Sequence, residues 1–222
     1  ENAFSVTAVS DFITAKELED VHKFAKNYGL NLKTATVDVL KHPDIVKNDK
    51  LRCQHCKEVI ITELKKLADQ QGIKHILDGS NIDDISDYRP GFEAAKKLGV
   101  KSPFIEAGFT KADIRQVSRL FNIQNWNKPA AACLASRIPY NTSIDLETLK
   151  RIEKAEAYLT KLGYEGIRVR DHSKLARIEL REKDIFSFVT QHRDLVNAYF
   201  KEIGYHYTCL DLKGYRMGSF NE

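Results

Sequence analysis

Short runs in which apolar and polar residues alternate are separated by segments in which apolar residues recur at helical spacing. Residues 4–9 and 32–37 have the alternation of strands. Between them the sequence predicts a helix over 14–28, which Thr14 and Glu17 would cap and Gly29 would end. This strand, helix, strand order is typical of two parallel strands joined by a helix.

The same alternation continues further along the chain. A helix is predicted over 56–71, with Gly72 ending it, and a short buried strand over 75–77 runs directly into Asp78. Further predictions are a helix over 92–99, a strand over 102–106 and a helix over 111–121 capped by Thr110. The pattern predicts a parallel sheet covered by helices on both faces. Ligands bind beyond the carboxyl ends of such strands, where Asp78, Gly79 and Ser80 follow the predicted strand.

After Trp126 the pattern changes. A loop over 127–141 is followed by a helix over 145–162, strands over 167–170 and 176–180, a helix over 183–203 and a strand over 205–210. This order is typical of a compact α+β domain. We therefore predict two domains, 1–127 and 128–222.

Composition is that of an ordinary globular protein, with 222 residues, 42% hydrophobic and 30% charged. No apolar run approaches the roughly 20 residues that span a bilayer, and the chain does not open on a signal peptide. We therefore expect a cytoplasmic protein. The net charge of +4 is small against 35 basic and 31 acidic residues, so it permits an anionic ligand without requiring nucleic acid.

Three cysteines are the first candidates for chemistry. Cys53 and Cys56 form a Cys-x-x-Cys pair, and Cys133 lies alone in the loop before the second domain. Such a pair serves as a chelating or a redox pair, and Arg52 and Lys57 beside it favour the reactive thiolate. A structural zinc site commonly needs a second pair, which is absent from the sequence. Three cysteines around a cubane would leave one iron open to another ligand. We expect Cys209, among apolar neighbours in a strand, to be a buried core thiol.

Arginines form the second candidate group: Arg137, Arg168, Arg170 and Arg216, the last in a glycine-flanked turn over 214–218. Residues two apart on a strand project to the same side, so Arg168 and Arg170 would bind one anion between them. The alternative for this pair is a solvated strand face. Glu156, on the helix over 145–162, would by itself be a surface carboxylate, and 78–84 would by itself be a turn.

Taken together, eight segments resemble those of one family. They are RCQHCK (52–57), DGSNIDD (78–84), DYRPG (87–91), PFIEAGFTK (103–111), CLASRIPY (133–140), RVR (168–170), ARIEL (176–180) and DLKGYR (211–216). From Ala8 to the C-terminus the chain resembles the LarE sulfur transferases of the ATP pyrophosphatase (PP-loop) superfamily. The resemblance implies a Rossmann-like α/β nucleotide-binding domain of adenine nucleotide alpha hydrolase type, followed by a smaller α+β catalytic domain. It also implies a homo-oligomer.

The family activity so implied is sulfur insertion into pyridinium-3,5-biscarboxylic acid mononucleotide, on the route to the nickel-pincer nucleotide cofactor. ATP, with Mg, would adenylate a carboxylate of this small-molecule substrate, and sulfur would then displace AMP. The family has two branches, and the three cysteines resemble the branch in which a [4Fe-4S] cluster delivers sulfide from an exogenous sulfide donor.

The resemblance also assigns individual residues. It places Cys53, Cys56 and Cys133 as ligands of the cluster, and gives catalytic roles to Cys133 and Glu156. Nucleotide phosphate or other anions would be bound by Ser136, Arg137, Arg168, Arg170 and Arg216. Gly79, Ser80 and Lys111 would lie near ATP.

One family feature does not occur in this sequence. The superfamily's phosphate-binding signature, Ser-Gly-Gly-x-Asp-Ser, belongs before the strand that starts near Phe4. As given, the first domain lacks the superfamily's first strand and phosphate loop, and we expect an upstream segment to supply them. Two alternative functions stay open at this point: a cluster-dependent tRNA thiolation enzyme of the same superfamily, and a non-catalytic metal-binding subunit.

Overall fold

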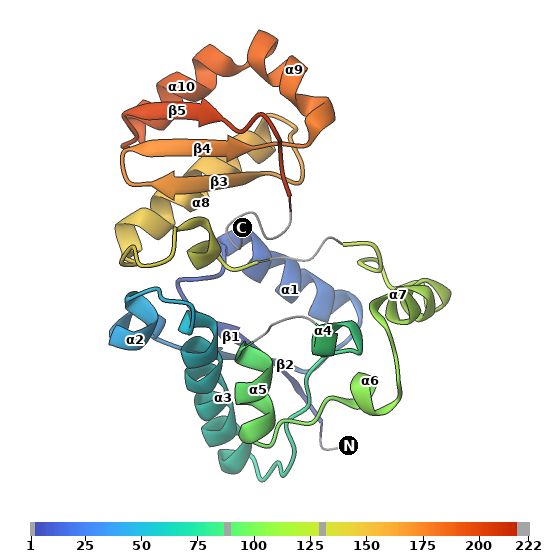
Figure 1. Cartoon of the computed structure of the whole chain (residues 1–222). Helices are drawn as coiled ribbons and strands as arrows, with labels where there is room; N and C mark the ends of the chain where they lie inside the picture. The colour runs from blue at the N-terminus through green and yellow to red at the C-terminus, as the bar shows by residue number, and fades with distance from the viewer. Residues whose placement is uncertain (1–2, 87–89, 129–131, 217–222) are drawn as a thin grey trace. The chain divides into compact units, whose positions relative to one another are not determined.

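The computed structural model describes residues 3–86, 90–128 and 132–216, which form two compact units (Figure 1). Unit 1 comprises Glu1–Ser10, Ala15–Ile45 and Asp49–Ala131, and unit 2 comprises Asp11–Thr14, Val46–Asn48 and Ala132–Glu222. The predicted bounds of 1–127 and 128–222 stay a prediction. Parts of the predicted motifs, namely 87–89 of DYRPG, 129–131 before Cys133 and 217–218 of the last turn, lie outside the described residues.

Unit 1 contains the predicted strand, helix, strand order. β1 (Ser5–Val9) and β2 (Leu32–Thr36) pair in parallel, with Thr7 opposite Thr34, and α1 (Ala15–Asn27) connects them. Gly29 follows α1 with φ 61°, a left-handed conformation that glycine adopts without a steric penalty. The helix and its glycine stop are therefore confirmed, as is parallel pairing for these two strands.

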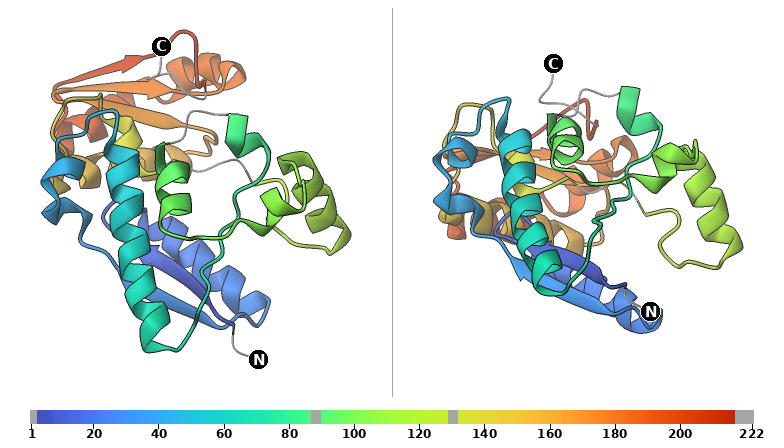
Figure 2. Two further views of the ribbon diagram at one scale, coloured as in Figure 1. Left: turned by 60° about the horizontal axis from the view of Figure 1, so that its bottom comes forward. Right: turned by 90° about the horizontal axis from the view of Figure 1, so that it is seen from below.

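The longest helix of unit 1 is α3 (Arg52–Gln70), which contacts both strands and lies beside α5 (Pro90–Lys97) in both views (Figure 2). The helix η1 (Val39–Lys41) and α2 (Pro43–Val46) precede it. Because α3 begins at Arg52 and not at the predicted Cys56, both cysteines of the pair lie within the helix. Gly91 faces this end of α3, and a Cβ at Gly91 would lie 3.3 Å from the Cys53 carbonyl oxygen.

Two predicted strands of unit 1 are wrong. Residues 103–106 form the short helix α6 (Pro103–Glu106), because Pro103 at its start fixes a helical φ and lacks only an N–H that the first turn would leave unbonded. The 75–77 strand reduces to one parallel bridge between Leu77 and Lys101, and Leu77 is 59% exposed and therefore not buried. Beyond these lie α4 (Asp83–Ser86) and α7 (Lys111–Leu120), and Thr110 caps α7 as predicted.

Unit 2 has the predicted α+β pattern with one difference. It contains η2 (Leu134–Arg137), α8 (Leu146–Lys161), β3 (Arg168–His172), β4 (Leu175–Glu179) and β5 (Tyr207–Leu210). The helix predicted over 183–203 is instead two helices, α9 (Glu182–Gln191) and α10 (Arg193–Glu202). The break is at His192, whose ψ is −7° and whose ring Nδ1 lies 2.6 Å from the Tyr164 hydroxyl.

The three strands of unit 2 form a mixed sheet in the order β3-β4-β5. β3 and β4 are antiparallel, with Val169 opposite Ile178, and β4 and β5 are parallel. Val169 and Ile178 are fully buried in one core cluster with Leu159 of α8, Phe188 of α9 and Phe200 of α10. Side chains alternate along a strand, so the neighbouring positions, among them Arg170, Arg177 and Glu179, belong to the opposite face of the sheet. That face carries the candidate site.

No helix in the described ranges is both long enough and apolar enough to cross a membrane.

Candidate functional site

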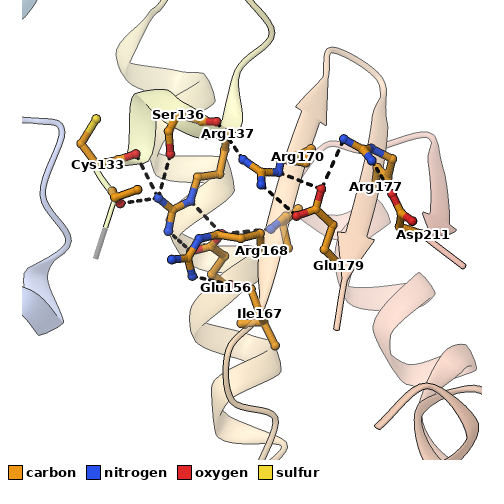
Figure 3. A network of polar contacts seen from close by, with 12 residues as sticks. Cys133, Ser136, Arg137, Glu156, Ile167, Arg168, Arg170, Arg177, Glu179 and Asp211 are labelled. Carbon is orange, nitrogen blue, oxygen red and sulfur yellow. Dashed lines mark hydrogen bonds and ion pairs between the residues drawn. The ribbon is translucent and has the colours of Figure 1, made fainter. Parts of the chain in front are cut away.

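The candidate anion site of unit 2 centres on a paired arginine in η2. Arg137 is 5% exposed, and its Nε and Nη2 donate to the two carboxylate oxygens of Glu156 at 3.0 and 2.9 Å (Figure 3). Its Nη1 donates to the carbonyl oxygens of Ala132 and of Cys133, the latter at 2.9 Å, and to the Ser136 hydroxyl at 3.2 Å. The Cys133 main chain is therefore bonded directly to the predicted anion-binding arginine.

A second buried pair lies on the neighbouring strands. Arg170 donates to both carboxylate oxygens of Glu179 at 3.0 and 2.8 Å, and its Nη1 donates to the Ser136 carbonyl at 2.9 Å (Figure 3). Arg177 also lies 3.3 Å from this carboxylate and pairs with Asp211. Glu179 is completely excluded from solvent. A buried carboxylate of this kind needs charged partners, and the two arginines supply them.

Arg168 differs from its neighbours because, among the described residues, it forms no ion pair with a carboxylate. Its guanidinium donates to the Ile167 carbonyl at 2.6 Å and lies over the ring of Tyr215, 5.0 Å from the ring centroid. Burial and then repulsion by Arg137 lower the pKa of Arg168, and the charge of Glu156 offsets only part of that lowering. An anion beside it would relieve that repulsion, so Arg168 has the position and charge of an anion-binding residue.

The turn that brings Tyr215 and Arg216 to this site depends on one glycine. Gly214 has φ 69°, and a Cβ there would lie 2.6 Å from the Leu180 carbonyl oxygen, which accepts the Tyr215 N–H at 2.7 Å. Asp211 opens the turn. Burial opposes its ionisation, but the Lys213 N–H, Arg177 and Arg216 outweigh burial and lower the pKa of Asp211. An ionised Asp211 therefore links the turn to Arg177.

In unit 1, the segment predicted to lie near ATP is held by its own side chains. The Asp78 carboxylate accepts the Ser80 hydroxyl at 2.9 Å and the Ser102 hydroxyl at 2.7 Å. Asp83 accepts the N–H of Lys111, at the start of α7, at 2.8 Å. Ser80 and the first turn of α7 are thus held by hydrogen bonds from the 78–83 segment. A Cβ at Gly79 would have no heavy atom within 4 Å, so the main chain there is not covered by other residues.

The two cysteines of the pair lie in the first two turns of α3. Cys53 is exposed and Cys56 is partly buried, and residues three apart in a helix share one face. Arg52, itself buried, has its Nη2 3.7 Å from the Cys53 sulfur. Cys209 on β5, predicted as a buried thiol, is only partly buried, and burial raises its pKa. None of the four cysteines forms a disulfide within the described residues.

Soft thiolates on one helical face fit two ligand positions of an iron–sulfur cluster. Cys133, the third predicted ligand, belongs to the other unit, so the complete three-cysteine set stays a prediction. Within the described ranges, no group of three or more His, Cys, Asp or Glu side chains is arranged to hold a metal ion.

Several residues of the site did not follow from the sequence. Glu179, Arg177 and Tyr215 lie among the predicted arginines, and Ser102 bonds to Asp78. The sequence did contain a signal for Glu179. It lies two residues from Arg177 on β4, as Arg168 lies two residues from Arg170 on β3, so each pair shares one face of its strand. Ser102 carried no such signal, because it was assigned to a strand.

Comparison with known proteins gives three relatives. An uncharacterized protein of Synechocystis is 40% identical over 223 residues, covering 100% of this chain and 83% of the relative. The pyridinium-3,5-bisthiocarboxylic acid mononucleotide synthase of Lactiplantibacillus plantarum is 34% identical over 222 residues, covering 100% of this chain and 80% of the synthase. An uncharacterized protein of Methanocaldococcus jannaschii is 34% identical over 192 residues, covering 86% of this chain and 73% of its own length. No protein-family model matches the chain.

Proposed function

Because the chain belongs to the LarE family of sulfur transferases, we propose that it converts a carboxylate of pyridinium-3,5-biscarboxylic acid mononucleotide into a thiocarboxylate. The name of the Lactiplantibacillus synthase supports this substrate, since the similarity to that enzyme covers the whole of this chain. The observation that carries the proposal is Arg168. It is a partly buried arginine with no carboxylate partner among the described residues, beside Arg137 and Tyr215, and it suits one mononucleotide phosphate.

The reaction needs activation, because a carboxylate is a poor electrophile. Attack of a substrate carboxylate oxygen on the α-phosphorus of ATP would release pyrophosphate and form an acyl-adenylate. A sulfur nucleophile would then form a C–S bond to the carbonyl carbon while the C–O bond to AMP breaks. AMP leaves with one oxygen of the original carboxylate, and the product is a thiocarboxylate. Thiolate or sulfide suits this step because it is strongly nucleophilic near neutral pH.

The arginines of the candidate anion site fall into two groups, those paired with a carboxylate and those proposed to contact the phosphate. Arg137 and Arg170 are engaged by Glu156 and Glu179 and give the site its shape. Arg168 would contact the phosphate directly, with the Ser136 hydroxyl and Arg216 as the further anion ligands that the family assigns. The sequence-based role of Glu156, to assist near the activated carboxylate, stays a prediction.

In unit 1, Gly79, Ser80 and Lys111 are the proposed contacts with ATP and its magnesium ion. The hydrogen bonds of Asp78 fix Ser80, and the Asp83 bond to the Lys111 N–H ties the same segment to α7. Together with the open space at Gly79, these bonds supply a fixed main chain along which phosphates could lie.

Cys53, Cys56 and Cys133 would hold a [4Fe-4S] cluster, whose chemistry when bound is to supply sulfide at an iron that no protein ligand occupies. The protein's part is to present the thiolates, with Arg52 beside Cys53 to stabilise negative charge. An external sulfide donor and a homo-oligomer complete the proposal.

Product analysis tests the proposal. The purified protein, reconstituted anaerobically with iron and sulfide, is incubated with the mononucleotide, ATP and magnesium, and the products are identified by mass spectrometry. We expect a substrate in which one oxygen is replaced by sulfur, with one AMP and one pyrophosphate formed for each thiocarboxylate. Thiolation of added tRNA without any thiocarboxylate would overturn the proposal.

A further inference from the structure

Arg137 connects the Cys133 main chain to Glu156 of α8, and through Glu156 to β3. Its guanidinium donates to Glu156 through Nε and Nη2. Nη1 donates to the carbonyls of Ala132 and Cys133 and to the Ser136 hydroxyl. The Cys133 carbonyl also accepts the Ser136 N–H at 2.9 Å. One side chain therefore holds the turn that begins at Cys133 (Figure 3).

Glu156, like Arg137, is fixed by several hydrogen bonds. Besides two bonds from Arg137, its Oε1 accepts the Val169 N–H of β3 at 2.9 Å. Its side chain is only 12% exposed. A carboxylate that receives two guanidinium N–H groups and a main-chain N–H is held in one orientation. Such a group is suited to positioning more than to carrying protons.

The geometry explains why both side chains are needed. A guanidinium is planar and presents donors along two edges, so one edge can bind the carboxylate while Nη1 reaches the carbonyls. A lysine ammonium would keep the charge beside Glu156 but has a single nitrogen from which to bond. Without Glu156, the guanidinium would be a buried charge without its counter-ion, free to turn away from the Cys133 carbonyl.

We propose that the Arg137–Glu156 pair is a positioning device for Cys133, and that Glu156 acts on the site through Arg137 and not by touching substrate. The proposal rests on the proposed function for the chemical role of Cys133. It assigns Arg137 to holding the main chain and leaves anion binding to Arg168, with Arg216 as the further ligand.

Two substrate-free measurements test the proposal on the whole chain without cluster. Amide hydrogen exchange reports the protection of Ser136, and iodoacetamide alkylation followed by peptide mass spectrometry reports the accessibility of Cys133. In Glu156→Gln, and in the second variant Arg137→Lys, we expect about tenfold faster exchange at Ser136 from the loss of charge-assisted bonds. Cys133 alkylation should change severalfold, while alkylation of Cys53 in the same molecules keeps its rate.

Asp171→Asn is the matched control. Asp171 on β3 binds Arg151 of α8 at 2.9 and 2.8 Å and is buried, so these two residues form a second buried arginine–carboxylate pair that involves α8. No bond joins that pair to residues 132–137 among the contacts described here. The control should lose stability without faster exchange at Ser136.

Several results would overturn the positioning role. One is a folded Glu156→Gln or Arg137→Lys protein in which Ser136 exchange and Cys133 alkylation keep their wild-type rates. Another is an Asp171→Asn protein in which Ser136 exchanges as fast as it does in the two test variants. In turnover assays, Glu156→Gln should lower kcat by the same factor at every pH, because a positioning residue does not titrate in the reaction. Loss of one limb of the pH profile would instead make Glu156 a proton carrier. Because exchange and alkylation need no substrate, their failure is separable from failure of the proposed function.

Discussion

Arg170 of β3 and Glu179 of β4 are diagonal neighbours on one face of the sheet, and the two nitrogens of the Arg170 fork donate to the two Glu179 oxygens at 3.0 and 2.8 Å. Glu179 is fully buried, and Arg177 approaches the same carboxylate. One carboxylate therefore neutralises much of the positive charge on this face of the sheet. Removing that carboxylate would leave two arginines in mutual repulsion.

Glu179→Gln should consequently destabilise unit 2. Breaking a buried ion pair by removing one partner costs about 3–5 kcal/mol of unfolding free energy, because the remaining charge stays buried. Urea unfolding followed by circular dichroism measures the loss. Glu165→Gln serves as the control, since Glu165 pairs with Arg181 at an exposed position and should change stability far less. Equal losses in both variants would contradict the structural role of Glu179.

Gly214→Ala should displace the turn that carries Tyr215 and Arg216. A Cβ would lie 2.6 Å from the Leu180 carbonyl oxygen, in addition to the strain of φ 69°. Gly29→Ala isolates the strain alone, since Gly29 has φ 61° and open space around it. We expect about 1–2 kcal/mol for Gly29→Ala and a clearly larger loss for Gly214→Ala, both measured by urea unfolding. Matching losses would show that the contact with Leu180 does not constrain the turn.

Arg168→Ala should weaken substrate binding more than it weakens the fold. Arg168 has no carboxylate partner among the described residues. The substitution therefore removes only one hydrogen bond to a carbonyl and the contact with the Tyr215 ring. A lost hydrogen bond to a charged phosphate is worth about 1.5–3 kcal/mol, which corresponds to a rise in KM of about 10- to 100-fold. Arg193→Ala on α10, where Arg193 is exposed beside Asp194, is the control with unchanged KM. An unchanged KM in Arg168→Ala would remove it from the anion site.

Iron content shows which of the four cysteines hold the proposed cluster. Anaerobically reconstituted protein should hold about four iron and four acid-labile sulfide per chain, and Cys53→Ala, Cys56→Ala and Cys133→Ala should each lose them. Cys209→Ala is the control, because Cys209 lies on β5 beside Arg177 of β4 and should retain the cluster. Zinc in place of iron, or a cluster kept in Cys133→Ala, would break the three-cysteine set.

The sequence predicted most elements of the fold because their signals are local. Capping residues and a glycine stop predicted α1 and α7, period-two alternation predicted β1 and β2, and the three strands of unit 2 were predicted as well. It failed where local signals compete. The apolar run at 103–106 suggested a strand, but Pro103 initiates a helix, and the apolar periodicity of 183–203 hid the break at His192.

The site was predicted in its residue types but not in its pairing. Alternation placed Arg168 and Arg170 on one face, yet it could not show that Glu179 engages Arg170 whereas Arg168 lies against Tyr215. Pairing of this kind depends on contacts between segments distant in the sequence, such as Arg137 with Glu156. Those contacts separate Arg137 and Arg170, which shape the site, from Arg168, which we propose binds the anion.

Oxygen tracing tests the central claim most directly. Mononucleotide labelled with ¹⁸O in its carboxylates is converted in the presence of ATP, and the AMP released is analysed by mass spectrometry. If the protein adenylates the carboxylate before sulfur enters, each AMP formed with thiocarboxylate carries one ¹⁸O from the substrate. Thiocarboxylate formed with unlabelled AMP, or with label in inorganic phosphate and release of ADP, would contradict activation through an acyl-adenylate.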